Sequence, residues 1–346
     1  MPRLSESEAL DLFLNAPLAD LCAKANAVKE ARHGKSIYWV NNRQINYTNI
    51  CVLHCTFCAF SKIKKDSPHA YDWSHEVVLQ KAGEAIAKGA RELHIVGGLH
   101  PDHPFSYYVE MLKKLRAAYP LVNLKAFTAV ELCYFAKKSD RPLSAIIGEL
   151  KEAGLDALPG GGAEILVQSV RDDICSDKET GQEWLDAHRA VHEAGIHTNA
   201  TMLFGHIETP EQRIQHLGML RDLQDDTNGF YSFIPLVFHP EHNSLGRRVG
   251  QKTGEEDILR TVAISRLFLD NFPHIKAYWV QMGVSTAMKA LHAGASDLDG
   301  TIIEEKITHA AGAESPVGMT PEHIQDLIRN EGLIPVERDA KYETYP

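Results

Sequence analysis

Short apolar stretches alternate with longer amphipathic segments along most of this chain. The apolar stretches are rich in β-branched and aromatic residues, as strands buried within a sheet are. The segments between them carry apolar residues three or four positions apart, which is typical of helices that pack one face on a sheet. The expected strands are Gln44–Ile50, Glu92–Val96, Asn123–Thr128, Ala157–Pro159, His197–Phe204, Phe230–Phe238, Ile275–Val280 and Gly300–Ile303.

The amphipathic segments predict a helix between successive strands. Such alternation favours a parallel sheet with right-handed crossovers. The expected fold class is therefore α/β, a (β/α)8 TIM-like barrel whose functional site lies at the carboxyl ends of the strands. An incomplete six-stranded barrel, with the C-terminal segment packed beside it, is the alternative. The expected helices are Ser74–Lys88, Pro104–Ala118, Pro142–Ala153, Gln182–Ala194, Pro210–Leu223, Glu255–Asn271 and Ser285–Ala293.

The N-terminal residues predict two helices outside this alternation. Ser5 and Glu8 have the spacing of a capping box, in which each side chain bonds to the backbone of the other residue. Gly34 is a suitable end for the second helix. No Pro-, Gly- or Ser-rich linker divides the remaining sequence. We therefore expect a helical extension over 1–43 and a single barrel domain over 44–346.

The composition argues against several classes of protein. The formal net charge is −10 over 346 residues and the one dense basic stretch is Lys62–Lys65, which we interpret as a solvated loop; nucleic-acid binding is thus disfavoured. No apolar run approaches the roughly 18 residues of a membrane span, and the N-terminus lacks a secretory hydrophobic region. Six scattered cysteines do not suggest a disulfide framework. A cytoplasmic protein without membrane contact is expected.

Three cysteines lie close together directly after the first expected strand. Cys51, Cys55 and Cys58 fall within eight residues, and three thiolates leave one iron of a four-iron cluster without a protein ligand. Ferredoxin-type carriers use four cysteines instead. The alternative is a closed zinc or redox-inert site, with His54, His69 or Cys133 as its fourth ligand. Cys22, Cys133 and Cys175 have no cysteine nearby in sequence, and we interpret them as ordinary thiols.

The C-x3-C-x2-C spacing resembles the signature of the radical S-adenosylmethionine (SAM) enzymes. The resemblance implies a radical SAM barrel, a [4Fe-4S] cluster on Cys51, Cys55 and Cys58, and SAM as a co-substrate that chelates the open iron. It also implies a one-electron donor such as flavodoxin or ferredoxin. Contacts to SAM are implied for an aromatic residue in the cysteine loop and for glycine, acidic and basic residues near strand ends. These are Phe57, Gly97, Gly98, Glu131, Glu164, Arg171, Lys178 and Gly205.

Each of these contacts has a structural alternative. Gly97 and Gly98 also suit a tight turn from strand to loop, and Phe57 also suits a loop residue that packs on the core. Arg171 and Lys178 are equally compatible with surface ion pairs. His206 follows Gly205 at the expected barrel mouth, where a histidine can orient a carboxylate or move a proton. We therefore expect His206 to be catalytic, with a hydrogen-bonded structural histidine as the alternative.

Further segments resemble the futalosine-pathway enzymes of menaquinone biosynthesis. They are Lys125–Glu131, Leu158–Ile165, Asn199–Thr209, Leu223–Asp225 and Phe233–Pro240.

The variants Asn199-Ala-Thr201 and Phe238-His-Pro240 favour one branch of this family. That branch adds the 5′-deoxyadenosyl radical of SAM to 3-[(1-carboxyvinyl)oxy]benzoate, whereas the cyclase of the same pathway abstracts hydrogen from its substrate. The enolpyruvyl benzoate carries two carboxylates, so cationic or strong donor groups are expected at the barrel mouth. A non-catalytic iron–sulfur or zinc protein is the alternative from another class. The expected substrate-binding residues are His100, Asn199, His239 and Gln281.

Overall fold

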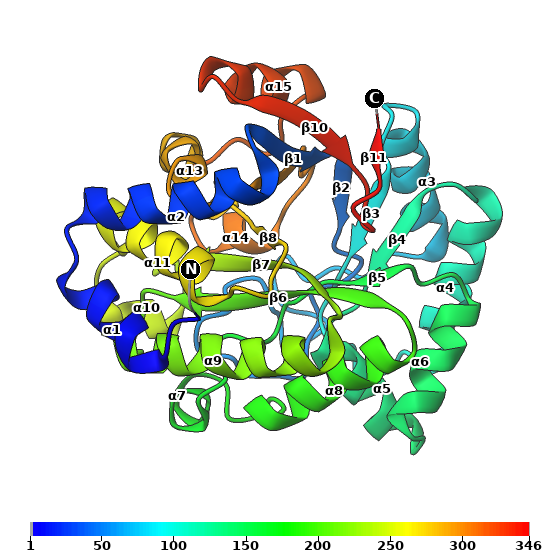
Figure 1. The fold of residues 1–346 in the computed structure, drawn as a ribbon. Helices are drawn as coiled ribbons and strands as arrows, with labels where there is room; N and C mark the ends of the chain where they lie inside the picture. Colours follow the sequence, from blue (N-terminus) through cyan, green and yellow to red (C-terminus); the bar gives the residue numbers. More distant parts are fainter. Residues whose placement is uncertain (1–2, 346) are drawn as a thin grey trace.

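Seven parallel strands form the main sheet of the protein (Figure 1). The structure is a computed structural model and describes residues 3–345. The strands follow one another in sequence order across the sheet, and each pairs in parallel with the next. They are β2 (Asn42–Ile45), β3 (Glu92–Ile95), β4 (Asn123–Ala126), β5 (Ala157–Leu158), β6 (His197–Phe204), β7 (Phe230–Val237) and β8 (His274–Ile275).

The curled sheet approaches closure through an eighth strand, β9 (Asp297–Gly300). A parallel bridge joins Lys276 to Asp297, and another joins Arg43 to Ile303, so the β9 region lies between β8 and β2. β9 itself belongs to a second, four-stranded sheet with β1 (Ser36–Val40), β10 (Ile334–Arg338) and β11 (Thr344–Tyr345). The expected TIM-like barrel class is therefore confirmed, with the main sheet forming a curled half-barrel.

Helices cover the outer face of the sheet, as Figure 1 shows. The strand boundaries differ most from the expected ones at three places. β2 ends at Ile45 rather than Ile50, β8 ends at Ile275 and a short helix follows, and β9 covers Asp297–Gly300 rather than Gly300–Ile303. The helices of the barrel are α3 (His75–Ile86), α4 (Phe105–Ala118), α5 (Ala129–Ser139), α6 (Leu143–Glu152), α7 (Gln168–Ile174), α8 (Gly181–Glu193), α9 (Pro210–Thr227), α10 (Ser244–Val249), α11 (Glu255–Phe268), α12 (Trp279–Met282), α13 (Val284–Leu291) and α14 (Ile307–Ala310).

Both chain ends pack against the barrel. α1 (Glu6–Asn15) contacts α9 and α11, and α2 (Leu18–His33) contacts α11. The capping box of Ser5 and Glu8 is present at the start of α1, and α2 ends at Gly34. β1 lies between β9 and β10, and α15 (Pro321–Asn330) precedes β10. The helical extension thus ends before β1, eight residues earlier than the expected boundary at 43.

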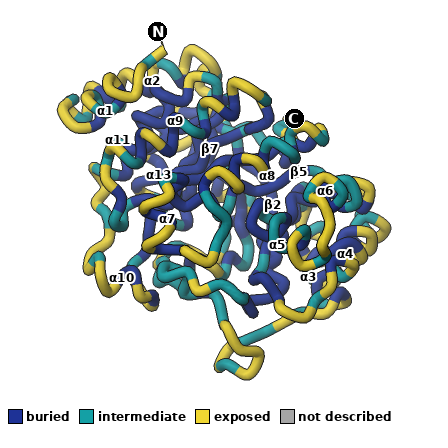
Figure 2. The backbone as a smooth tube through the Cα atoms, turned by 90° about the horizontal axis from the view of Figure 1, so that it is seen from below, coloured by how far each residue is buried: buried dark blue, intermediate teal, exposed yellow. Residues whose placement is uncertain are grey.

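The interior of the barrel combines an apolar core with a charged layer. Figure 2 shows buried residues concentrated in the strands and exposed ones on the outer helices and loops. Arg338 reaches from β10 into the barrel, where its Nε lies 2.7 Å from Oδ2 of Asp297. Tyr342 donates to the same oxygen at 2.8 Å. Over residues 3–345, no helix is both long and apolar enough to cross a lipid bilayer.

Candidate active site

A cavity of about 330 Å³ opens at the carboxyl ends of the barrel strands. This is the position at which the barrel fold places a functional site. The loop after β2 forms one part of the wall, with Cys51, Cys55 and Cys58. Apolar residues of the strands, including Leu203 and Leu236, form another part. The cavity therefore brings the cysteine motif and the strand interior into one space.

Backbone hydrogen bonds fix the cysteine loop from several sides. The Cys51 amide donates to the Lys62 carbonyl at 3.0 Å, and the Val52 amide donates to the Leu99 carbonyl at 3.1 Å. The Thr56 amide donates to the Ile174 carbonyl at 2.9 Å. The loop is thus held by segments that follow β3 and β5, so its three thiols keep their places on the cavity wall.

The three thiols are not arranged as the ligands of a single zinc ion. A tetrahedral zinc site with Zn–S bonds of 2.3 Å would bring its sulfurs to about 3.8 Å from one another. Within residues 3–345, the one group of three ligand side chains with atoms all within 4.8 Å is Asp72, His100 and His103, not the cysteines. The three sulfurs are therefore not gathered around a single tetrahedral ion.

The candidate fourth ligands lie in other environments. His54 Nδ1 lies within hydrogen-bond distance of Asp177 Oδ2 at 3.0 Å, and its side chain is 58 % exposed. His69 accepts a hydrogen bond at its carbonyl from the Asn49 side chain. Cys133 lies on α5. These environments give no support to a closed zinc site.

Close packing explains the glycine pair after β3. A Cβ atom at Gly98 would lie 2.2 Å from the carbonyl oxygen of Ile50, and one at Gly97 would lie 2.7 Å from the Tyr47 ring. Larger residues would thus displace the segment that leads into the cysteine loop. Both glycines also line the cavity, so the tight packing and the expected contact to SAM are compatible.

Glu131 is a buried carboxylate on the cavity wall. It accepts hydrogen bonds from the Tyr47 hydroxyl at 2.8 Å and from the Gly97 amide at 3.3 Å. It also forms the capping box of α5 with Thr128. Burial raises the pKa of Glu131 to about 7, against the opposing effect of these hydrogen bonds. The carboxyl group therefore exchanges its proton near neutral pH while it holds the Gly97 backbone.

Glu164 and Lys178 form a buried ion pair beside Phe57. The Lys178 ammonium lies 2.5 Å from Glu164 Oε1 and 5.3 Å from the centre of the Phe57 ring. Burial would lower the pKa of Lys178, but the charges of Glu164 and Cys55 raise it, so the ammonium stays charged. All three side chains line the cavity. The structure thus brings together three of the expected SAM contacts.

Arg171 has a different environment from the expected one. Its guanidinium donates to the backbone carbonyls of Ala163 at 2.6 Å and of Glu179 at 3.0 Å, and the side chain is 1 % exposed. These bonds join the loop after β5 to the segment after α7. The guanidinium donates its hydrogens to these carbonyls, so fewer of them remain for the expected pairing with the SAM carboxylate.

The His206 ring also forms hydrogen bonds with the protein backbone. Its Nε2 lies 3.0 Å from the Leu203 carbonyl, and its Nδ1 accepts from the Ile207 amide at 2.8 Å. Burial lowers its pKa, so the ring is neutral. Gly205 has a positive φ of 88° and packs against Thr253. Both ring nitrogens have partners, so this environment fits the structural alternative rather than the expected catalytic role.

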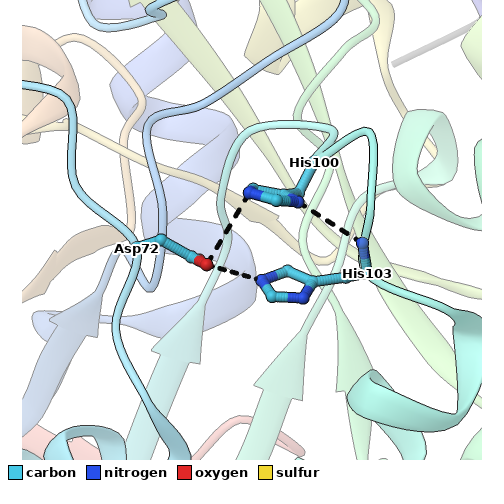
Figure 3. Close-up of side chains that lie close together, drawn as sticks. All are labelled: Asp72, His100 and His103. Atoms are coloured by element: carbon cyan, nitrogen blue, oxygen red, sulfur yellow. Dashed lines mark hydrogen bonds and ion pairs between the residues drawn. The ribbon is translucent and has the colours of Figure 1, made fainter. Parts of the chain in front are cut away.

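The expected substrate-binding residues separate into two groups. Asn199, His239 and Gln281 line the cavity, whereas His100 lies beside Asp72 and His103 (Figure 3). The Nε2 atom of His239 lies 3.0 Å from the Gln281 carbonyl and must donate to it. Its buried Nδ1 has no partner within residues 3–345. Because burial lowers the pKa of His239, this atom accepts and cannot donate to a carboxylate.

The Asp72, His100 and His103 group is an internal hydrogen-bonding cluster. The Nε2 atoms of His103 and His100 lie 2.8 and 3.6 Å from Asp72 Oδ2. The Nδ1 of His100 accepts from the amides of Asp102 and His103, so in the neutral ring Nε2 carries the proton. That nitrogen has no free lone pair for a metal, and the cluster therefore joins two loops rather than forming a metal site.

Three comparisons with known proteins agree with this geometry. Residues 45–220 match the radical SAM superfamily, and residues 227–346 match the CofH/MqnC C-terminal region. The chain belongs to the radical SAM superfamily. A Thermus thermophilus aminodeoxyfutalosine synthase is 46% identical over 98% of this chain and 92% of its own.

Other relatives of this radical SAM enzyme carry different names. A 5-amino-6-(D-ribitylamino)uracil–L-tyrosine 4-hydroxyphenyl transferase of Methanopyrus kandleri is 41% identical over 90% of this chain and 85% of its own. A cyclic dehypoxanthine futalosine synthase of Streptomyces coelicolor is 37% identical over 99% of this chain and 85% of its own. The chain is thus most similar, among these three, to an enzyme of the futalosine route to menaquinone.

Solved structures show the same radical SAM fold. The hydrogenase maturase HydG from Carboxydothermus hydrogenoformans matches 98% of this chain and 77% of its own with a TM-score of 0.76 at 18% identity. Methylornithine synthase (PylB) matches 96% of this chain and 94% of its own with a TM-score of 0.73 at 16% identity. The family implies a [4Fe-4S] cluster and SAM, and the three spaced thiols on the cavity wall fit the cluster.

Sequence reasoning missed part of this radical SAM cavity. Gln44, His94 and Lys125 lie within β2, β3 and β4 and line the cavity below the strand ends. A signal was present, because these strands carry polar residues at alternate positions that the barrel interior would bury. Apolar patterning alone does not identify these inward-facing polar positions.

Proposed function

We propose that this enzyme adds the 5′-deoxyadenosyl group of SAM to 3-[(1-carboxyvinyl)oxy]benzoate. The products are 6-amino-6-deoxyfutalosine, methionine and bicarbonate. The main support is the similarity to aminodeoxyfutalosine synthase over nearly the whole of both chains. When bound and reduced, the cluster supplies the electron that cleaves SAM into methionine and the adenosyl radical. A one-electron donor such as flavodoxin or ferredoxin would deliver that electron.

The cysteine loop and its neighbours would hold the cofactors in this proposal. Cys51, Cys55 and Cys58 would carry three irons. Lys178 stays charged beside Glu164, so the pair could offer a cation and a carboxylate to the methionine and ribose groups of SAM. Phe57 adds an aromatic face at the same wall.

The rest of the cavity would protect and orient the reacting carbons. Leu203, Ile234 and Leu236 line it with hydrocarbon side chains, which exclude the water that would quench or divert a radical. Asn199 accepts from the Ser232 hydroxyl at 2.9 Å through Oδ1. Its amide nitrogen donates to no residue within 3–345, so it could donate to a ligand. Holding the double bond against the radical carbon in this way can supply several kcal/mol of rate acceleration.

Product analysis distinguishes this reaction from that of the cyclase. The reconstituted enzyme is incubated without oxygen with SAM labelled in its 5′ carbon, a reductant and the enolpyruvyl benzoate. We expect mass spectrometry to find the label in the covalent product. Label recovered only as free 5′-deoxyadenosine, with no adduct, would contradict the proposal and favour hydrogen abstraction. A Cys58→Ser variant serves as the control for cluster-independent chemistry.

A further inference from the structure

A row of polar side chains crosses the floor of the cavity. Gln44, His94 and Lys125 are direct register partners on the adjacent strands β2, β3 and β4. All three line the cavity, so their side chains lie next to one another on the same face of the sheet. They lie within the strands, whereas Gly97 and Glu131 follow the strand ends. We call these three residues the floor row.

The floor row offers hydrogen-bond donors and a cation. Lys125 lies 2.5 Å from Oε1 of Glu92, and the two side chains are 3% and 0% exposed. Burial would raise the pKa of Glu92, but the charges of Lys125 and Arg338 lower it to about 2. Glu92 is therefore ionised and forms a buried ion pair with Lys125. An ammonium has three hydrogens, so Lys125 retains two that are not directed to this oxygen.

His94 and Gln44 complete the row as neutral groups. Burial, and then the charge of Lys125, lower the pKa of His94 to about 3. The ring is therefore neutral at physiological pH and has one N–H donor. Gln44 contributes an amide with two further donor hydrogens. A cation at one end of a row, followed by two neutral donors, is an arrangement that binds a carboxylate by charge-assisted hydrogen bonds.

The carboxylates that face the cavity have partners of their own. Asp299 lies 3.2 Å from the Lys276 ammonium. Glu305 accepts from the Thr308 amide at 2.8 Å and lies 3.0 Å from His309. Glu164 and Glu131 are bonded to Lys178 and Tyr47. Within residues 3–345 none of these four carboxylates accepts a hydrogen bond from the floor row, so its donors are open to a ligand.

We propose that the floor row is the subsite for the ring carboxylate of an aromatic acid substrate. The proposal rests on the proposed function, since the enolpyruvyl benzoate carries one carboxylate on its reacting end and one on its ring. The reacting double bond must reach SAM near the cysteines. The ring carboxylate is then the group that extends toward the strands. His239, which can only accept, is unsuited to this role.

The test compares the acid with an analogue whose ring carboxylate is replaced by a carboxamide. The row is disrupted in Gln44→Leu, in His94→Phe and in the double variant Lys125→Met with Glu92→Gln, which leaves no buried charge unpaired. The matched control is Arg116→Met with Asp156→Asn, which removes a partly buried ion pair whose residues do not line the cavity. For each protein, kcat/KM and equilibrium binding are measured for both ligands, together with the SAM-induced change in the EPR spectrum.

We expect wild type and control to prefer the acid, and the row variants to lose about 10- to 100-fold of that preference. The SAM-induced EPR change should persist in all of them. Equal losses for acid and amide, or an unchanged preference, would overturn the subsite while leaving the function standing. If the acid binds wild type more tightly than the row variants but is not converted, the result would support the subsite and refute the proposed function. A wild type that neither binds nor converts the acid refutes both.

Discussion

The buried carboxyl group of Glu131 allows a quantitative prediction of how stability depends on pH. Replacing Glu131 with Gln keeps the size and shape of the side chain but removes its ionisation. Gln still offers an oxygen to the Tyr47 hydroxyl or to the Thr128 amide. Any loss from the remaining hydrogen bonds is the same at every pH, so the pH dependence isolates the ionisation itself.

The magnitude follows from the pKa of this group. Burial raises the pKa of Glu131 from 4.5 to about 7, and each unit of pKa corresponds to about 1.4 kcal/mol. The folded state thus favours the protonated carboxyl. Its contribution is fully present below pH 4.5 and is lost as the pH rises through 7. The unfolding free energy of Glu131→Gln minus that of wild type should therefore increase by about 3 kcal/mol between pH 4.5 and pH 8.

The assay is urea denaturation of both proteins across this pH range, without SAM and under anaerobic conditions. Taking the difference removes the contributions of all other titrating groups. Glu183→Gln is the matched control, because Glu183 forms the same kind of capping box on α8 but is exposed. Its pKa is lowered by the Thr180 hydrogen bonds, so its stabilisation is lost only below pH 4.5 and its difference should stay nearly flat across this range. A flat difference for Glu131→Gln would refute the reasoning.

Three further substitutions test how individual residues support the site. Gly98→Ala places a methyl group 2.2 Å from the Ile50 carbonyl and should reduce the iron content after reconstitution; normal iron loading would contradict this packing argument. Arg171→Leu leaves backbone carbonyls unpaired and should lower the free energy of unfolding by about 2–5 kcal/mol, measured by chemical denaturation. Unchanged stability together with weaker SAM binding would instead support the expected contact between Arg171 and SAM. His206→Ala should lower the melting temperature, while the folded enzyme still forms the same product. A changed product distribution would instead support the expected catalytic role of His206.

Hydrophobic patterning predicted the order of the barrel strands well. Buried strands need apolar side chains and the helices between them need one apolar face, so their sequence must alternate. The strand predicted over Ile275–Val280 was wrong beyond Ile275, because its apolar residues Trp279 and Val280 are buried in a short helix instead. β1 was missed because we treated the residues up to 43 as part of the helical extension.

Spacing located the candidate site but not the direction of its side chains. The three cysteines were predicted because a short loop must bring them together. Arg171 and His206 lie on segments near the cavity, yet each side chain binds neighbouring backbone. Burial favours such bonds because an unpaired buried carbonyl or amide is costly. Sequence alone does not show whether a polar side chain will form its hydrogen bonds with the backbone or with a ligand.

The meeting of the two chain ends has a consequence for biosynthesis. β1 leaves the ribosome long before its register partner Ile334, which lies far along the sequence. Until then, Asp297 also lacks both Arg338 and Tyr342. The charged layer inside the barrel is therefore completed only after Arg338 and Tyr342 have been synthesised and have bound Asp297. A chain shortened by the last nine residues would be left with this charged layer incomplete, and would be a natural substrate for proteases.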